Sequence, residues 1–305
     1  MVASEKIENT KEINVENIPA MNTQTWKERL ASYKRTPGSL AVMVMVLLAS
    51  CITIAALLFL LIYILANGIP YLNADLFSWT YTSENVSVVP ALINTVLMAG
   101  ISLLLAVPFG IGSAIYLVEY AKKGNKLVKL VRVTAETLTG IPSIVYGLFG
   151  MLFFVTALHW KFSILAGGCT LAIMVLPIIL RTTEEALIAV PDSFREGSFG
   201  LGAGKLRTIF KIILPSAVPG ILSGIILSTG RIVGETAALI YTAGTVAAIP
   251  KDLFSSGRTL AVHMYVLSNE GLHVNQAYAT AVVLLVLVIL INALSSFLAK
   301  KIQKV

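Results

Sequence analysis

Two residues that could do chemistry, Arg231 and Glu235, lie in a stretch of the chain that is otherwise almost entirely apolar, "STGRIVGETAAL". A charge at the middle of a membrane costs about 2.5–3.5 kcal/mol on insertion scales, so an intramembrane charge usually marks a water-filled pathway. Positions i and i+4 share one face of a helix, so we expect the two side chains to lie one turn apart and to pair. The alternative is an internal ion pair that only fixes the rotation of this helix in a bundle.

The chemistry that Arg231 offers is the binding of an oxyanion, because a guanidinium presents a fork of donors that can replace the water of a phosphate. Glu235 is expected to hold Arg231 and to weaken the site, so that a transported ion can leave again. Since the pair is neutral, net attraction requires a second arginine from a partner subunit. Arg181 is either a further contact near the inner exit or a positive-inside anchor, and Thr236 either a hydroxyl donor or a helix-to-helix contact.

Small residues next to Arg231 predict close helix packing. Gly230 and Gly234 form a G-x-x-x-G pair, a spacing that lets another helix approach closely. Gly220 and Gly224 repeat the spacing earlier in the same segment. The sequence therefore predicts a helix that packs tightly on one side and turns its charges toward another.

The composition places the chain among membrane proteins. Of 305 residues, 56% are hydrophobic and 13% are charged, where a soluble domain has about a quarter charged residues. The net charge of +7 is spread along the chain, which argues against binding to nucleic acid. Cys51 and Cys169 lie in apolar segments, without the spacing of a disulfide or metal site.

The elements that must position these residues are six membrane-spanning helices, since about 20 apolar residues cross a bilayer. We expect them at residues 40–66, 88–119, 135–158, 162–180, 216–246 and 277–298. Residues 1–39 form a polar tail with a possible interfacial helix, and residues 299–305 form a second tail. Lysine and arginine concentrate in alternate loops, so both termini are predicted to be cytoplasmic. The three histidines, His159, His263 and His273, are expected at the outer surface.

The inner loop, residues 181–215, is expected to fold into short helices. Capping boxes at Thr182 and Ser193 predict two helix starts, and glycines after residue 199 predict a left-handed stop. The loop either packs on its own bundle or docks a cytosolic partner. The residues themselves favour neither alternative.

This loop resembles the "EAA" loop of the permeases of ATP-binding-cassette (ABC) importers. The matching positions, at the spacing of the family, are Glu196, Gly202, Ile212, Leu214 and Pro215. Gly197 and Ser198 replace the two alanines of the pattern, and both are small. The resemblance implies that this segment is the coupling helix that sits in a cleft on the ATPase subunit.

A narrower resemblance covers most of the chain from Val89 to Leu298. The segments "RTTEEAL", "IPSIVYGLFG" and "GRIVGETAAL" are similar to those of PstA-type permeases of phosphate importers. The resemblance implies a type I, MetI-like permease core over residues 88–298 in the cytoplasmic membrane. It also implies a PstC-type sister permease, a dimer of PstB-type ATPases and a PstS-type phosphate-binding protein as partners.

The chain lacks the phosphate loop that an ATPase needs. Its one Gly-Lys pair, Gly204 and Lys205, is followed by Leu206, and Phe199 stands where the first glycine is required. We therefore expect a transport subunit that is not an enzyme, holds no cofactor or metal, and leaves ATP and magnesium to partner subunits. The alternatives are a permease for another oxyanion such as sulfate, an ion-coupled secondary carrier, and a membrane scaffold or sensor.

Overall fold

A computed structural model describes residues 37–122 and 124–303 of the chain, with side chains up to residue 297. Most of the expected polar tail, including the possible interfacial helix, lies outside these residues. All regular structure in the described part is helical. The chain divides into two compact units, Met1–Leu61 and Ile62–Val305. In the first unit, the described residues belong to α2 (Pro37–Gly68), which covers the first expected span and continues into the second unit.

The second unit contains the remaining helices. The long ones are α3 (Val89–Ile115), extended by the π-helical turn η4 (Tyr116–Tyr120), α6 (Ile164–Ile188), α9 (Leu214–Val233) and α12 (Val274–Gln303). The shorter ones are α4 (Lys126–Thr139), α5 (Ser143–Gly150), η5 (Met151–Ala157), α7 (Asp192–Gly200), α8 (Lys205–Thr208), η6 (Ile209–Ile213), α10 (Ala237–Ile240) and α11 (Leu260–Glu270). Short 3-10 turns, η2 (Ile69–Tyr71) and η3 (Ala74–Phe77), precede α3.

Five helical segments are long and apolar enough to span a membrane, and a sixth candidate is a bent pair. The five are Gly38–Tyr71, Val89–Tyr120, Ile164–Ile188, Lys205–Val233 and Val274–Phe297. The expected spans at 40–66, 88–119, 162–180 and 277–298 each lie almost wholly within one of these. The described fold is therefore the predicted all-helical membrane architecture with up to six spans.

The third expected span, residues 135–158, is not one straight helix. α4 and the α5–η5 segment meet at an angle of 102° around Gly140–Pro142. Proline has no N–H to donate and disfavours helical geometry in the residue before it, so Pro142 ends one helix and precedes the next. The Tyr146 hydroxyl donates to the carbonyl of Leu138 at 2.8 Å, a bond that joins the two sides of the bend.

The fifth span was predicted at residues 216–246, and both of its ends are wrong. The helical segment starts at Lys205, because α8 and η6 lead directly into α9, and it ends at Val233. Residues beyond Gly234 enter the short α10 and then a loop. The sequence remains mostly apolar beyond Val233, so hydropathy alone placed the end of the span too late.

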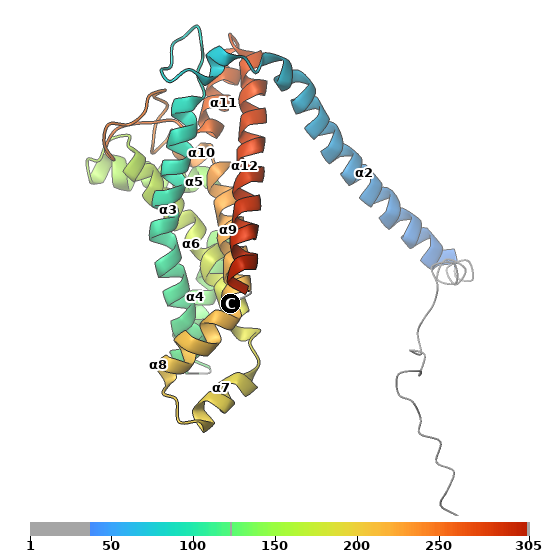
Figure 1. Cartoon of the computed structure of the whole chain (residues 1–305), viewed down its shortest axis with the longest axis vertical. Coiled ribbons are helices and arrows are strands. Elements are labelled where there is room, and N and C mark those ends of the chain that lie inside the picture. The colour runs from blue at the N-terminus through green and yellow to red at the C-terminus, as the bar shows by residue number, and fades with distance from the viewer. Residues whose placement is uncertain (1–36, 123, 304–305) are drawn as a thin grey trace, which may run out of the picture. The chain divides into compact units, whose positions relative to one another are not determined.

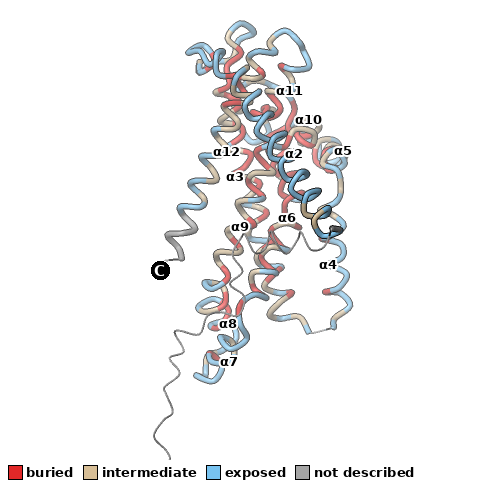
Figure 2. The backbone as a smooth tube through the Cα atoms, turned by 90° about the vertical axis from the view of Figure 1, so that its right-hand side faces the viewer, coloured by how far each residue is buried: buried red, intermediate tan, exposed pale blue. Residues whose placement is uncertain are grey.

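The core of the second unit lies between α3, α6 and α9, which run side by side in Figure 1. Figure 2 shows many buried residues along these helices. α3 and α6 make the most extensive contact of any pair of elements, and α6 also packs closely against α9. Fully buried side chains such as Met98, Leu171, Met174 and Ile232 fill the space between them.

The two ends of this bundle differ. α7 and α8 lie at one end of the long helices, and α11 lies toward the other (Figure 1).

The predicted start of a helix at Thr182 is wrong, because α6 continues to Ile188 and the Thr182 hydroxyl donates to carbonyls of its own helix. α7 starts at Asp192, one residue before the predicted cap. Gly202 has a φ of +80°, which confirms the expected left-handed stop.

Candidate functional site

Arg231 lies in the last turn of α9, and its residue is neither fully buried nor fully exposed. Its guanidinium makes no hydrogen bond or ion pair with any residue that the structure describes. A cation inside a candidate span therefore stands without a carboxylate partner in the described chain.

Glu235 does not share a helical face with Arg231, and the predicted ion pair is absent from the described structure. α9 ends at Val233, and the backbone leaves the helix at Gly234. The buried carboxylate of Glu235 instead accepts a hydrogen bond from the backbone N–H of Ala238 at 3.1 Å. An acceptor at the start of a helix satisfies an N–H group that has no partner within the helix. Glu235 thus caps α10 and leaves the charge of Arg231 uncompensated within these residues.

The hydroxyl groups near Arg231 have different environments. Thr236 stands at the N-terminal cap of α10, but its side chain makes no capping bond. Thr229 donates to the carbonyl of Ile225 in its own helix. The buried hydroxyl of Ser228 has no hydrogen-bond partner among the described residues. Of the three, Thr229 is the one already engaged by its own helix.

Close helix packing in this chain occurs at Gly220 and Gly224 instead of Gly230 and Gly234. A Cβ added at Gly220 would lie 2.6 Å from Cβ of Ala186 in α6, and one added at Gly224 would collide with Thr182. Around Gly230, by contrast, nothing in the described chain lies within 4 Å of such an atom. The predicted close approach of another helix at Gly230 and Gly234 is therefore not made by any residue that the structure describes.

Arg181 is part of a charged network between α4 and α6. Its guanidinium lies 3.1 Å from the carboxylate of Glu185 and 3.6 Å from that of Glu136. Beside it, Nε of Arg132 donates to the nearly buried Glu184 at 2.6 Å. Arg181 therefore differs from Arg231, because nearby carboxylates balance its charge.

The five residues of the EAA-like motif lie on two sides of the α7–α8 turn. Glu196 is exposed on α7 and has no ion-pair partner among the described residues, and Gly202 forms the left-handed turn. Ile212 and Leu214 pack against a core of α3, α6, η6 and α9, and Pro215 lies in the first turn of α9. Ile212 and Leu214 thus attach the segment to the helical bundle, whereas Glu196 stays accessible on its surface.

Large apolar side chains on this same segment are exposed, which the sequence analysis did not identify. They come from α7, α8, η6 and the turn between α7 and α8: Phe194, Phe199, Leu201, Leu206 and Phe210. Leu201 is 91% exposed. Contiguous exposed apolar residues on a protein surface mark sites of protein or membrane interaction. A surface of this kind favours docking over packing on the chain's own bundle.

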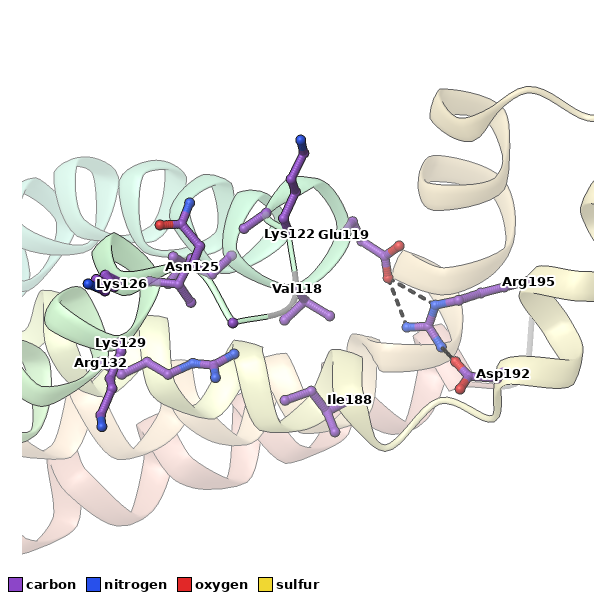
Figure 3. A pocket seen from close by; sticks show the side chains of 14 residues that line it. Val118, Glu119, Lys122, Asn125, Lys126, Lys129, Arg132, Ile188, Asp192 and Arg195 are labelled. Carbon is purple, nitrogen blue, oxygen red and sulfur yellow. Dashed lines mark hydrogen bonds and ion pairs between the residues drawn. The ribbon is translucent and has the colours of Figure 1, made fainter.

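Arg195 joins α7 to the ends of two long helices. Its guanidinium donates to the carboxylate of Glu119 in η4, and also to the carbonyls of Leu187 and Val190 at 3.0 and 2.8 Å. Asp192, one turn earlier on α7, is a further partner at 3.1 Å. In Figure 3, dashed lines connect Arg195 to both carboxylates. In the sequence, Arg195 was recognised only as one of the basic residues expected on the cytoplasmic side. That pattern does not reveal its partners in the fold.

A cavity of about 840 Å³ adjoins this arginine. Its walls come from η4, α4, the end of α6 and α7, and Figure 3 shows their side chains around it. The charged and polar residues of the lining are Glu119, Lys122, Asn125, Lys126, Lys129, Arg132, Asp192 and Arg195. A smaller cavity of about 280 Å³, which holds Arg181 and Glu136, shares Arg132 and Ile188 with it.

A second feature missed by the sequence analysis lies at α11. His263 is fully buried, so its expected place on the surface is wrong. Arg258 is also buried, stacks over the ring of Tyr81 at 4.7 Å, and has two guanidinium nitrogens without a hydrogen-bond partner among the described residues. Burial and the neighbouring charge of Arg258 lower the pKa of His263 from 6.5 to about 3. The imidazole is therefore neutral at physiological pH.

Comparison with known proteins assigns the chain to a family. Residues 106–304 match the family described as "Binding-protein-dependent transport system inner membrane component". The chain is 32% identical over 281 residues to "Probable ABC transporter permease protein YqgI" of Bacillus subtilis, covering 84% of this chain and 93% of that protein. It is 35% identical over 224 residues to "Phosphate transport system permease protein PstA 1" of Mycobacterium tuberculosis (strain H37Rv), covering 70% and 72%.

The fold is also similar to that of solved transporters. A chain in the crystal structure of a bacterial alginate ABC transporter, in complex with an alginate pentasaccharide-bound periplasmic protein, aligns with a TM-score of 0.66. The alignment has 17% sequence identity and covers 89% of this chain and 98% of that chain. The chain belongs to the family of binding-protein-dependent transport system inner membrane components, as a multi-pass PstA-type ABC permease subunit.

Proposed function

We propose that the chain is the permease subunit of an ATP-driven importer of inorganic phosphate. The observation that carries this proposal is Arg231, a guanidinium in a candidate span without a carboxylate partner in the described chain. A relative that covers 70% of the chain is named as a phosphate permease, which supports the choice of cargo. Together they favour an anion pathway beside α9.

Arg231 would bind the phosphate by replacing part of its hydration with charge-assisted hydrogen bonds. With Glu235 engaged at the start of α10, this attraction does not depend on a second arginine from another chain. The neutral hydroxyls of Ser228, three positions before Arg231, and of Thr236, five positions after it, are candidates for further donors. A single cation with neutral donors binds an anion weakly enough to release it, as transport requires.

Energy would come from outside this chain. We infer that Glu196, Gly202 and the exposed apolar side chains of α7 and α8 seat a PstB-type ATPase subunit, which binds ATP and magnesium. Closure of the ATPase dimer would move this segment, and the rigid contacts of Ile212 and Leu214 would carry the motion into α9. A PstC-type sister permease and a PstS-type binding protein would complete the pathway and deliver the ion, and no cofactor would reside in this chain.

Reconstituted transport tests this proposal. The chain is co-expressed with candidate PstC-type and PstB-type subunits, purified as a complex and placed in liposomes with a PstS-type protein. We expect ATP-dependent uptake of labelled phosphate that excess unlabelled sulfate does not reduce. Strong competition by sulfate would reassign the cargo to another oxyanion. Accumulation driven by an ion gradient, by this chain without any ATPase, would contradict the proposal as a whole.

A further inference from the structure

The larger cavity beside Arg195 combines unpaired positive charge with apolar walls. Both carboxylates that line it, those of Glu119 and Asp192, already accept hydrogen bonds from Arg195. Arg132, from α4, is bound to Glu184. The remaining charged groups in the lining are three lysines, and none forms an ion pair with a described residue: Lys122, Lys126 and Lys129. The cavity therefore carries an excess of positive charge.

Apolar side chains form much of the remaining wall of this cavity. Leu117, Val118, Val128 and Ile188 line it, and Ile188 is 60% exposed. A free inorganic anion gains nothing from such walls, whereas a molecule with a charged head and an apolar body is matched by both parts.

The cavity also lies where a membrane surface is expected. It opens at η4, where the apolar candidate span Val89–Tyr120 ends and the polar connection to α4 begins. The same end of the bundle holds α7 and α8 (Figure 1). At the end of a span, lipid head groups meet the side chains, and basic pockets between helices at this depth attract anionic lipids.

We propose that this cavity binds the head group of an anionic phospholipid. The lysine side chains would hold the lipid phosphate, and the apolar walls of the cavity would hold the glycerol and the first acyl carbons. Because Arg195 forms one side of the cavity, a bound lipid would also stabilise the position of α7 relative to η4 and α4. The inference depends only on the placement of the chain in a membrane and is independent of the transported ion.

The test compares lipid binding by the purified full-length chain and by two matched variants. One replaces Lys122, Lys126 and Lys129 by glutamine, and the control replaces Lys161, Lys211 and Lys251 by glutamine. All six lysines are exposed, and the control triple lies outside the lining of the cavity, so both variants lose equal charge. Binding of phosphatidylglycerol and of phosphatidylcholine is titrated in detergent by native mass spectrometry, and circular dichroism checks that each variant is folded.

We expect the cavity variant to bind phosphatidylglycerol at least about tenfold more weakly than the unmodified chain, since each basic residue near an anionic head group contributes about 1 kcal/mol. The control variant is expected to bind it normally. A photoactivatable phosphatidylglycerol should label peptides from residues 117–132. The proposal is overturned if both variants lose the same affinity, if phosphatidylcholine binds as well, or if millimolar inorganic phosphate displaces the lipid.

Discussion

Glu119 and Arg195 are 76 positions apart in the sequence, yet both Nε and Nη2 of the arginine donate to one carboxylate oxygen, at 3.1 and 2.8 Å. The two side chains are only 9% and 16% exposed. Through this contact α7, which carries the exposed docking residues, is joined to the end of the first core helix. Arg195 therefore links α7 to the ends of α3–η4 and α6 at the site where an ATPase is proposed to act.

Replacing Arg195 by alanine is expected to destabilise the chain, because it leaves the nearly buried Glu119 carboxylate without its partner. Breaking a buried pair in this way costs about 3–5 kcal/mol of unfolding free energy. Asp192→Asn is the matched control, since this carboxylate is 82% exposed and its pairing is worth less than about 1 kcal/mol. Denaturation in detergent measures both. Adding Glu119→Gln to Arg195→Ala should restore part of the loss, and no recovery would contradict the pairing.

Arg231→Ala is expected to abolish phosphate uptake while the complex still assembles, because the anion loses its only proposed guanidinium in this chain. The control is Lys251→Ala, which removes an exposed cation from the segment between α10 and α11, away from the proposed docking surface. Uptake of labelled phosphate and size-exclusion chromatography measure the two effects separately. Normal uptake by Arg231→Ala would remove Arg231 from the pathway. Loss of assembly in this variant would show that its role is structural.

Glu235 is expected to stabilise the fold as a hydrogen-bond acceptor for the N–H of Ala238, more than through its negative charge. Glu235→Ala removes the acceptor that caps α10 and should lower the unfolding free energy by about 1 kcal/mol, the typical effect of a lost cap. Glu235→Gln keeps an oxygen at the same place and should retain most of the stability. Thermal unfolding of the two variants in detergent distinguishes them. Equal losses in both would mean that the negative charge matters, as an ion pair with Arg231 requires.

The buried His263 is expected to make the folded chain less stable as the pH falls. Its pKa of about 3 in the folded chain is lower than the 6.5 of the unfolded chain. Between these values the unfolded state binds one more proton, so the unfolding free energy falls by about 1.4 kcal/mol per pH unit as the pH decreases below 6.5. His263→Gln should reduce the loss of stability between pH 7.5 and 5.5, whereas His159→Gln, at an exposed histidine, should not. An unchanged pH dependence in His263→Gln would refute the assignment.

Glu196→Lys tests the docking surface. The carboxylate is exposed and unpaired among the described residues, so its reversal should leave the fold intact and weaken association with the ATPase subunit. We expect reduced co-purification, or transport that no longer responds to ATP. Glu270→Lys, the same charge reversal at an exposed position on α11, is the control. If co-purification and coupling both survive in Glu196→Lys, then Glu196 does not lie at the interface.

Sequence alone determined the class of this protein and most of its spans. Runs of about 20 apolar residues predict membrane helices because only a helix satisfies its own backbone in lipid. The motif from Glu196 to Pro215 was enough to indicate the family, because its spacing depends on residues close together in the chain. The left-handed turn at Gly202 followed from the same local logic, since glycine adopts a positive φ without steric cost.

The tertiary structure decided which charged residues have partners. α9 stops at Val233 because the chain turns to place α10 against α5, where the Cα of Ala238 lies 2.8 Å from the position of a Cβ on Gly147. Nothing near residue 234 encodes that contact, so the helical periodicity wrongly paired Arg231 with Glu235. The bond from Arg195 to Glu119, the burial of His263 and the basic cavity likewise depend on segments far apart in sequence. Local patterns report propensity and hydropathy, whereas the pairing or isolation of a charge is set by what the folded chain brings beside it.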